Sequence, residues 1–136
     1  MVDFGGSLKI AFDDMNGADG NIAWVTGNSS NGGNTTADLN TTVEALYLAG
    51  TNGEGVLNGD LLRATTVANE FNAEFNITAS SGQDALLVVN ATNSNRFAVY
   101  SYLESGNGAE IQGTELRLIG VFDSNGDVAT SQLNFI

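Results

Sequence analysis

Acidic and carboxamide side chains gather at several places in this chain, and their oxygen atoms are the kind of ligand that Ca²⁺ binds. Residues 13–21 hold three aspartates and two asparagines, and residues 123–127 place Asp, Asn and Asp at alternate positions, as a calcium loop does. Each segment is either a weak site of the extracellular, millimolar kind or a turn with solvated carboxylates. The candidate ligands in these two segments are Asp13, Asp14, Asn16, Asp19, Asp123, Asn125 and Asp127.

A further candidate is the loop that begins at Glu104 and ends at Glu115. If Ile111 takes the aliphatic eighth position of a calcium loop, these glutamates occupy the first and last ligand positions. Gly106 and Gly108 then stand where such loops carry side-chain oxygens. An earlier segment, 50–61, keeps a different half of the ligand set. Both segments are therefore either incomplete calcium sites or plain hairpin loops, and Ca²⁺ is the only cofactor that the sequence suggests.

Catalytic chemistry has little support in this sequence. The chain has no His and no Cys, which excludes Ser-His and Cys-His nucleophile systems. A glycosidase-type carboxylate pair stays open, but most acidic residues lie in turn-like stretches, so we expect no enzyme. The aromatic residues in strand-like segments either form a sugar-stacking platform or pack within the sheet: Trp24, Tyr47, Tyr100 and Tyr102.

The charge balance argues against two classes of partner. Four basic residues stand against 16 acidic ones, for a net charge of −12. Nucleic acid and anionic membrane surfaces are bound through Lys and Arg, which are almost absent here. No apolar run reaches the roughly 18–20 residues of a membrane span, and residues 1–6 lack the features of a cleavable signal peptide. An acidic, Cys-free chain rich in Asn, Thr and Gly is typical of bacterial or archaeal surface and matrix proteins.

Apolar residues alternate along most of the chain, with the period of half-buried strands. Gly, Asn, Ser and Asp clusters separate the alternating segments, as turns do. Size and spacing predict a single all-β domain over 1–136, an antiparallel β-sandwich or a barrel-like fold. Segments 35–48 and 61–73 also fit short helices, although we favour a strand over 43–49.

One motif is written twice, which predicts that the domain is built from two similar β units. Residues 57–63 (Leu-Asn-Gly-Asp-Leu-Leu-Arg) return 54 positions later as 111–117 (Ile-Gln-Gly-Thr-Glu-Leu-Arg). Flanking similarity extends the units to approximately 22–67 and 86–121. We expect Leu62 and Leu116 to point inward, and Arg63 and Arg117 to face outward and form salt bridges with acidic loops.

The second unit resembles the C-terminal, bluetail-like domain of type I-secreted bacterial surface proteins, which often follows RTX-type calcium repeats. The likeness rests on the aliphatic run 86–89 with Asn90, the aromatic strand 97–100, the segment 110–122 and the closing residues 129–136. The resemblance implies export by a type I system that reads an uncleaved C-terminus. It also implies residence at the cell surface or in an extracellular matrix. This family usually carries Asp and Asn where this chain has Gly106 and Gly108, and the chain contains no RTX nonapeptide array.

These features predict an extracellular structural protein that self-associates into a filament, a surface layer or a biofilm matrix. Soluble β proteins protect sheet edges with Lys and Pro, but this chain has one Lys and no Pro. Terminal strands at 7–12 and 133–136 are therefore expected to pair with neighbouring subunits. The predicted interface residues are Lys9, Arg63, Arg117, Phe135 and Ile136. The alternatives are an adhesin-type module for polysaccharide or a cell-surface ligand, and a secretion-signal domain of a larger protein.

Overall fold

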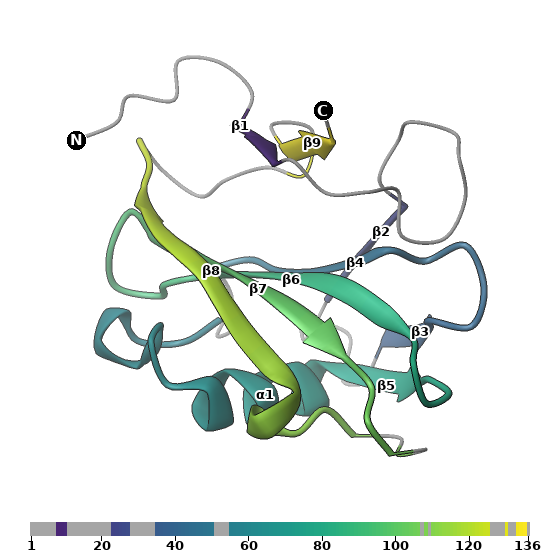
Figure 1. The fold of residues 1–136 in the computed structure, drawn as a ribbon. Helices are drawn as coiled ribbons and strands as arrows, with labels where there is room; N and C mark the ends of the chain where they lie inside the picture. The colour runs from purple at the N-terminus through teal and green to yellow at the C-terminus, as the bar shows by residue number, and fades with distance from the viewer. Residues whose placement is uncertain are drawn as a thin grey trace.

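The computed structural model describes residues 8–10, 23–27, 35–50, 55–106, 108, 110–125, 130 and 133–135. A five-stranded sheet with the strand order β2-β4-β6-β7-β8 forms its centre (Figure 1). Strands β2, β4 and β6 run parallel, whereas β6, β7 and β8 are antiparallel neighbours. The strands are β2 (Trp24–Thr26), β4 (Ala45–Leu48), β6 (Asp84–Asn90), β7 (Arg96–Leu103) and β8 (Leu116–Asp123).

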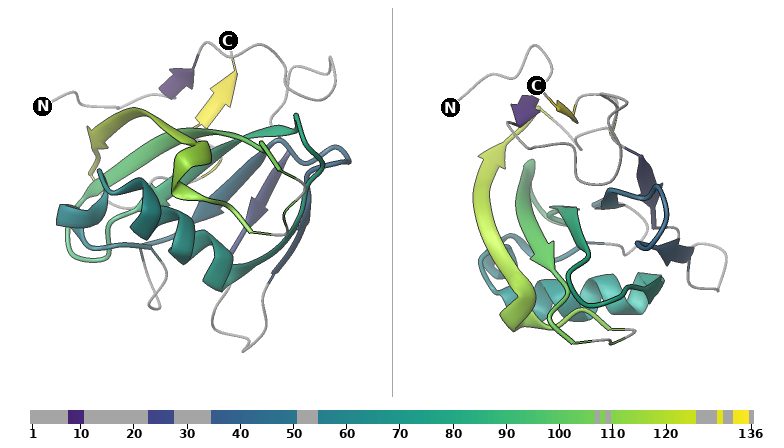
Figure 2. Two further views of the ribbon diagram at one scale, coloured as in Figure 1. Left: turned by 60° about the horizontal axis from the view of Figure 1, so that its bottom comes forward. Right: turned by 45° about the vertical axis from the view of Figure 1, so that its right-hand side comes forward.

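The remaining elements surround this sheet. Helix α1 (Ala64–Glu74) lies against one face (Figure 2). Two short parallel pairs are β3 (Thr35–Asp38) with β5 (Phe75–Thr78), and β1 (Leu8–Ile10) with β9 (Leu133–Phe135). Two 3-10 turns are η2 (Asn58–Asp60) and η3 (Gly113–Glu115). In the described part of the chain, no helix has the length and apolar character needed to cross a membrane.

The prediction of a sheet-rich domain is confirmed, but the purely antiparallel, all-β arrangement is wrong. The central sheet is mixed, and it is not closed into a barrel. Segment 61–73 takes the helical alternative, because Val67, Ala68 and Phe71 share one buried helix face. Segment 43–49 forms strand β4, as favoured. Parallel strands need a long crossover connection, and α1 lies in the crossover from β4 to β6. A face-to-face sandwich stays a prediction.

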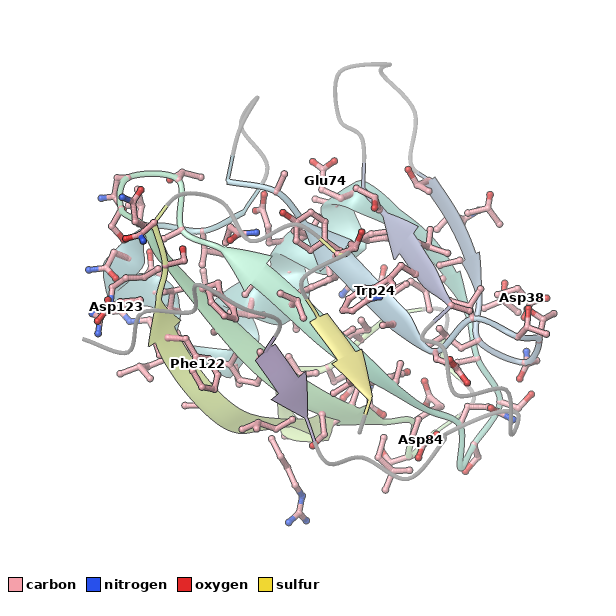
Figure 3. The ribbon with its side chains drawn as sticks, turned by 90° about the horizontal axis from the view of Figure 1, so that it is seen from above. Trp24, Asp38, Glu74, Asp84, Phe122 and Asp123 are labelled. Carbon is pink, nitrogen blue, oxygen red and sulfur yellow. The ribbon has the colours of Figure 1, made fainter. Side chains whose placement is uncertain are left out.

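Two apolar clusters lie on opposite faces of the central sheet, which explains the continuous apolar run of β6. Leu87 and Val89 belong to the cluster beneath α1, and Leu86 and Val88 belong to the other. We call the second one the distal cluster, and its buried members are Ala45, Tyr47, Leu86, Val88, Phe97 and Val99. The β1–β9 pair lies over this distal face of the sheet (Figures 1 and 3).

Both copies of the repeated motif form a 3-10 turn, η2 in the first copy and η3 in the second, but η3 begins one motif position later than η2. The first copy leads into α1, whereas the second leads directly into β8. Leu116 is 7% exposed, as expected, but Leu62 is 67% exposed and the neighbouring Leu61 is buried instead. The prediction for Leu62 is wrong because a further turn follows η2, which moves the buried position back by one residue. Duplication of the whole unit stays a prediction.

Candidate functional site

Two buried glutamates close the loop that joins β7 to β8. Glu104 directly follows β7, and Glu115 ends η3 immediately before β8. They are 2% and 6% exposed, and Ser105, the residue after Glu104, donates two hydrogen bonds to Glu115. The two ends of the candidate calcium loop therefore meet in space. We call Glu104, Glu115 and the neighbouring Tyr102 the carboxylate clasp.

Donors from the loop and from β7 hold both carboxyl groups. The Tyr102 hydroxyl donates to Oε2 of Glu104 over 2.5 Å, and the Gly106 backbone N–H donates to Oε1 of Glu104 over 2.7 Å. Ser105 donates to Oε1 of Glu115 from its backbone N–H over 3.0 Å and from its hydroxyl over 2.8 Å. Buried carboxyl oxygens need this degree of hydrogen bonding to offset their lost hydration. The clasp is thus built mainly from its own loop.

The clasp shifts the pKa values of two of its members in opposite directions. Burial alone would raise the pKa of Glu115, but hydrogen bonds from the Ser105 and Gln112 backbones and from the Ser105 and Glu104 side chains outweigh it, so this pKa is lowered. The Gln112 bond is 2.9 Å long and belongs to a capping box around η3. Burial, the bond to Glu104 and the two carboxylate charges all raise the pKa of Tyr102. Tyr102 therefore remains a neutral donor at neutral pH, and Glu115 remains an ionised acceptor.

Helix α1 holds the middle of the same loop. The Asn72 side chain donates to the Ile111 carbonyl oxygen and accepts from the Ile111 N–H, both over 2.8 Å. Gly113 packs so closely on the first turn of α1 that a Cβ there would lie 2.8 Å from the backbone nitrogen of Thr65. No sequence motif marks Asn72, because its partner lies 39 positions away. The loop is therefore fixed at its ends and at its centre.

The carboxylate oxygens of the clasp are suitable ligands for a weakly bound cation. Carboxylate oxygens keep lone pairs beside the hydrogen bonds that they accept, and hard cations bind such oxygens. Two carboxylates held close together repel each other, and a bound cation would lower that repulsion. The two carboxyl groups of a glycosidase lie on either side of its substrate. The carboxyl oxygens of the clasp instead accept hydrogen bonds from Tyr102, Ser105 and the loop N–H groups. Within the described residues, no third acidic side chain joins the pair to complete a metal-binding group.

The structure places the other candidate ligands only in part. Asp123 forms an ion pair with Arg96, in which Oδ1 and Nε are 2.7 Å apart. A guanidinium there competes with a cation for the same oxygen, so calcium at 123–127 stays a prediction with less support. No sequence pattern marks Arg96, because its partner follows only from the register of β7 with β8. The candidates that lie outside the described residues are Asp13, Asp14, Asn16, Asp19 and Asp127.

The predicted interface residues at the chain ends lie on strands that pair with each other. Lys9 is the middle residue of β1, and Phe135 is the last residue of β9. The two strands run parallel within one chain. Ile136 lies outside the described residues.

Strand β8 is an open edge of the central sheet, and β7 is its only strand neighbour among the described elements. Leu118 and Ile119 are 43% and 41% exposed on this edge, and a β-bulge interrupts its register with β7. Arg117 is also exposed there, without an ion pair to any described residue. Its counterpart Arg63 pairs with Asp60 at 3.2 Å, so the expected salt bridge is confirmed for Arg63.

The aromatic residues considered for sugar stacking are engaged in packing. Tyr100 and Tyr102 are each 1% exposed, and Tyr47 is 6% exposed. Trp24 is half-buried and meets Tyr47 edge-on, with the ring centroids 6.4 Å apart. The Tyr100 hydroxyl donates to the Leu61 carbonyl oxygen over 2.5 Å. These four rings therefore form no exposed row.

No protein-family model matches this sequence, and searches of curated proteins and of solved structures returned no match. The resemblance to the bluetail-like domain stays a prediction that rests on the residues quoted for it.

Proposed function

We propose that this protein is an extracellular structural protein that self-associates at a cell surface or in a matrix. The observation that carries the proposal is the open edge at β8. This strand is eight residues long and contains neither Lys nor Pro. It exposes two neighbouring aliphatic side chains, Leu118 and Ile119. Edges of this kind template association unless they are covered or charged.

The bulge limits the kind of contact that β8 can make. A bulged strand does not present a regular row of backbone groups along its whole length. We therefore expect the partner to meet β8 through side chains and a short run of backbone hydrogen bonds. Arg117 adds a cation on this strand, and a second copy with a net charge of −12 supplies many acidic partners.

Light scattering over a range of protein concentrations, with Ca²⁺ and with a chelator, tests this proposal. The mass of the wild type is expected to rise with concentration, and Leu118→Lys is expected to suppress the rise because it charges the edge. The matched control is Leu62→Lys, at a leucine that is 67% exposed and lies off the sheet. A strict monomer at high concentration in both media refutes self-association. Equal effects of the two lysines refute β8 as the contact.

Calcium binding is a second part of the proposal. The support is that Ser105, which follows Glu104, donates hydrogen bonds to Glu115, so the first and last positions of the candidate loop lie close together. Glycine at the third and fifth positions weakens the site, so we expect millimolar affinity. Millimolar Ca²⁺ should raise the melting temperature of the wild type but not that of Glu115→Gln. No rise in the wild type refutes this part.

Type I export is the third part, and it rests on the resemblance of residues 86–136 to the bluetail-like domain. A fusion of these residues to a passenger protein, expressed with a type I transporter, should be exported. A fusion that stays inside the cell, while a known type I substrate is exported alongside it, refutes this part.

A further inference from the structure

The two ends of the chain meet in one small sheet. Strand β1 belongs to the N-terminal end and β9 to the C-terminal end, and they pair in parallel. Leu8 is opposite Leu133, and Ile10 is opposite Phe135. The pair forms a sheet of its own, and among the described strands neither member pairs with any other. Each terminal strand therefore has the opposite end of the chain as its strand partner.

This pair lies over the distal cluster. Seen from above in Figure 3, β1 and β9 cross the sheet between Phe122 and Trp24, two side chains that pack against that cluster. The buried members of the cluster are at most 6% exposed. An apolar face of this kind has to stay covered in every assembly of the protein. The β1–β9 pair lies over this face, and its two strands need not come from one copy.

We propose that β9 of one copy pairs with β1 of the next, so that copies join head to tail by exchanging a terminal strand. This inference rests on the proposed self-association and adds a second contact between copies to the one proposed at β8. The exchanged pair repeats the contacts of the closed pair, so exchange needs no new interface. Each copy offers one β1 and one β9, and such a heterologous contact propagates into a linear chain.

The lengths of the connections permit the exchange. Strand β8 ends at Asp123 and β9 begins at Leu133, so residues 124–132 join them. Nine extended residues span up to ~30 Å, about the width of a small domain. The same tether gives the closed pair an effective concentration of about millimolar. Exchange is therefore expected as the protein approaches that concentration, or where copies are crowded together on a surface.

Engineered disulfides report which copy supplies each strand, because the chain contains no Cys. Lys9 and Asn134 are register partners in the β1–β9 pair. Lys9→Cys and Asn134→Cys, carried by separate copies, are mixed at high concentration and oxidised. The expected product is a disulfide between the two variants. The matched control mixes Lys9→Cys with Thr92→Cys, which lies in an exposed turn. A yield no higher than that of the control overturns the inference.

The double variant, with both substitutions in one copy, separates this inference from the proposed function. Oxidised in dilute solution, it should form an internal disulfide, and the locked protein should show a smaller concentration-dependent rise in mass than its reduced form, because only the β8 contact remains. If the locked and reduced forms associate equally, self-association stands and strand exchange is overturned. If the wild type never associates, the proposed function fails as well. If no internal disulfide forms, the closed pairing itself is refuted.

Discussion

The sharpest prediction compares alanine at the same position in the two copies of the repeated motif. These residues are Gly59, the middle residue of η2, and Gly113, the first residue of η3. We expect Gly113→Ala to destabilise the protein and Gly59→Ala to stabilise it slightly. The motif alone gives no reason for the difference, so the comparison tests the packing of the second copy against α1.

The magnitude follows from the space around each glycine. At Gly113 a Cβ would lie 2.8 Å from the backbone nitrogen of Thr65 and 2.9 Å from its Cα, against the 3.4–4 Å of ordinary contact. Those atoms belong to the helix backbone, so the η3 loop has to move. Overpacking of this kind costs about 1–3 kcal/mol, and the reduced entropy of the unfolded chain offsets about 0.4–1 kcal/mol. The net loss of unfolding free energy is therefore about 1.3 kcal/mol at the midpoints of these ranges, and at most about 2.6 kcal/mol.

At Gly59 no heavy atom lies within 4 Å of the added Cβ, and this glycine is not among those with positive φ. Only the reduced conformational entropy of the unfolded chain then matters, and it stabilises the protein by about 0.4–1 kcal/mol. Urea unfolding followed by circular dichroism measures both variants under the same conditions. Thermal unfolding should show shifts of about 4 °C per kcal/mol. If the two variants differ by less than about 0.5 kcal/mol, the close approach of Gly113 to Thr65 is refuted.

Three further predictions concern the loop and the clasp. Asn72→Ala removes both hydrogen bonds to Ile111 and should cost about 1–3 kcal/mol in urea unfolding, whereas Asn76→Ala, at an exposed position of β5, should change little; equal losses would contradict the role of Asn72. Burial raises the pKa values of Tyr100 and Tyr102. Their contribution to the free energy of unfolding is therefore complete below the pKa of about 10 that tyrosine has in the unfolded chain, and it is lost as the pH rises above that value. Tyrosinate absorbance should therefore rise only as the protein unfolds in alkali, and ionisation of these two residues in the folded state would refute their burial. The lowered pKa of Glu115 stabilises the fold above the unfolded value of about 4.3, and this stability is lost as the pH falls through the folded pKa. Glu115→Gln should therefore flatten the acid dependence of the melting temperature, and an unchanged slope would contradict the assignment.

The alternation of apolar residues predicted the strands. The predicted fold class was wrong in part because some segments fit both the helical and the strand periodicity. Residues 61–73 fit a helix or a strand equally well, and the choice depends on where Phe71 and Val67 find an apolar partner. The sequence also did not show which neighbouring strands run parallel and which run antiparallel. The run 86–89 is consistent with a strand that is buried on both faces. The sequence does not show which other residues pack with it on each face, so the distal cluster could not be predicted.

Only part of the candidate site could be predicted from the sequence. Glu104 and Glu115 could be paired because a calcium loop fixes the spacing of its first and last ligands. The donors of Tyr102 and Ser105 are close in sequence, yet nothing in the motif shows that they are turned toward the carboxylates. Asn72 could not be found, because its hydrogen bonds with Ile111 exist only after α1 has packed beside the loop.

By itself, the sequence determined the properties that depend on composition and on neighbours along the chain. These are the acidic composition, the absence of His and Cys, and the alternating apolar segments that form strands. Tertiary structure alone decided that β1 pairs with β9, that Asp123 meets Arg96, and that Gly113 must be glycine while Gly59 need not be. The physical reason is the same in each case. Local patterns set which conformation a segment can adopt, whereas a contact between distant segments depends on how the whole chain buries its apolar faces.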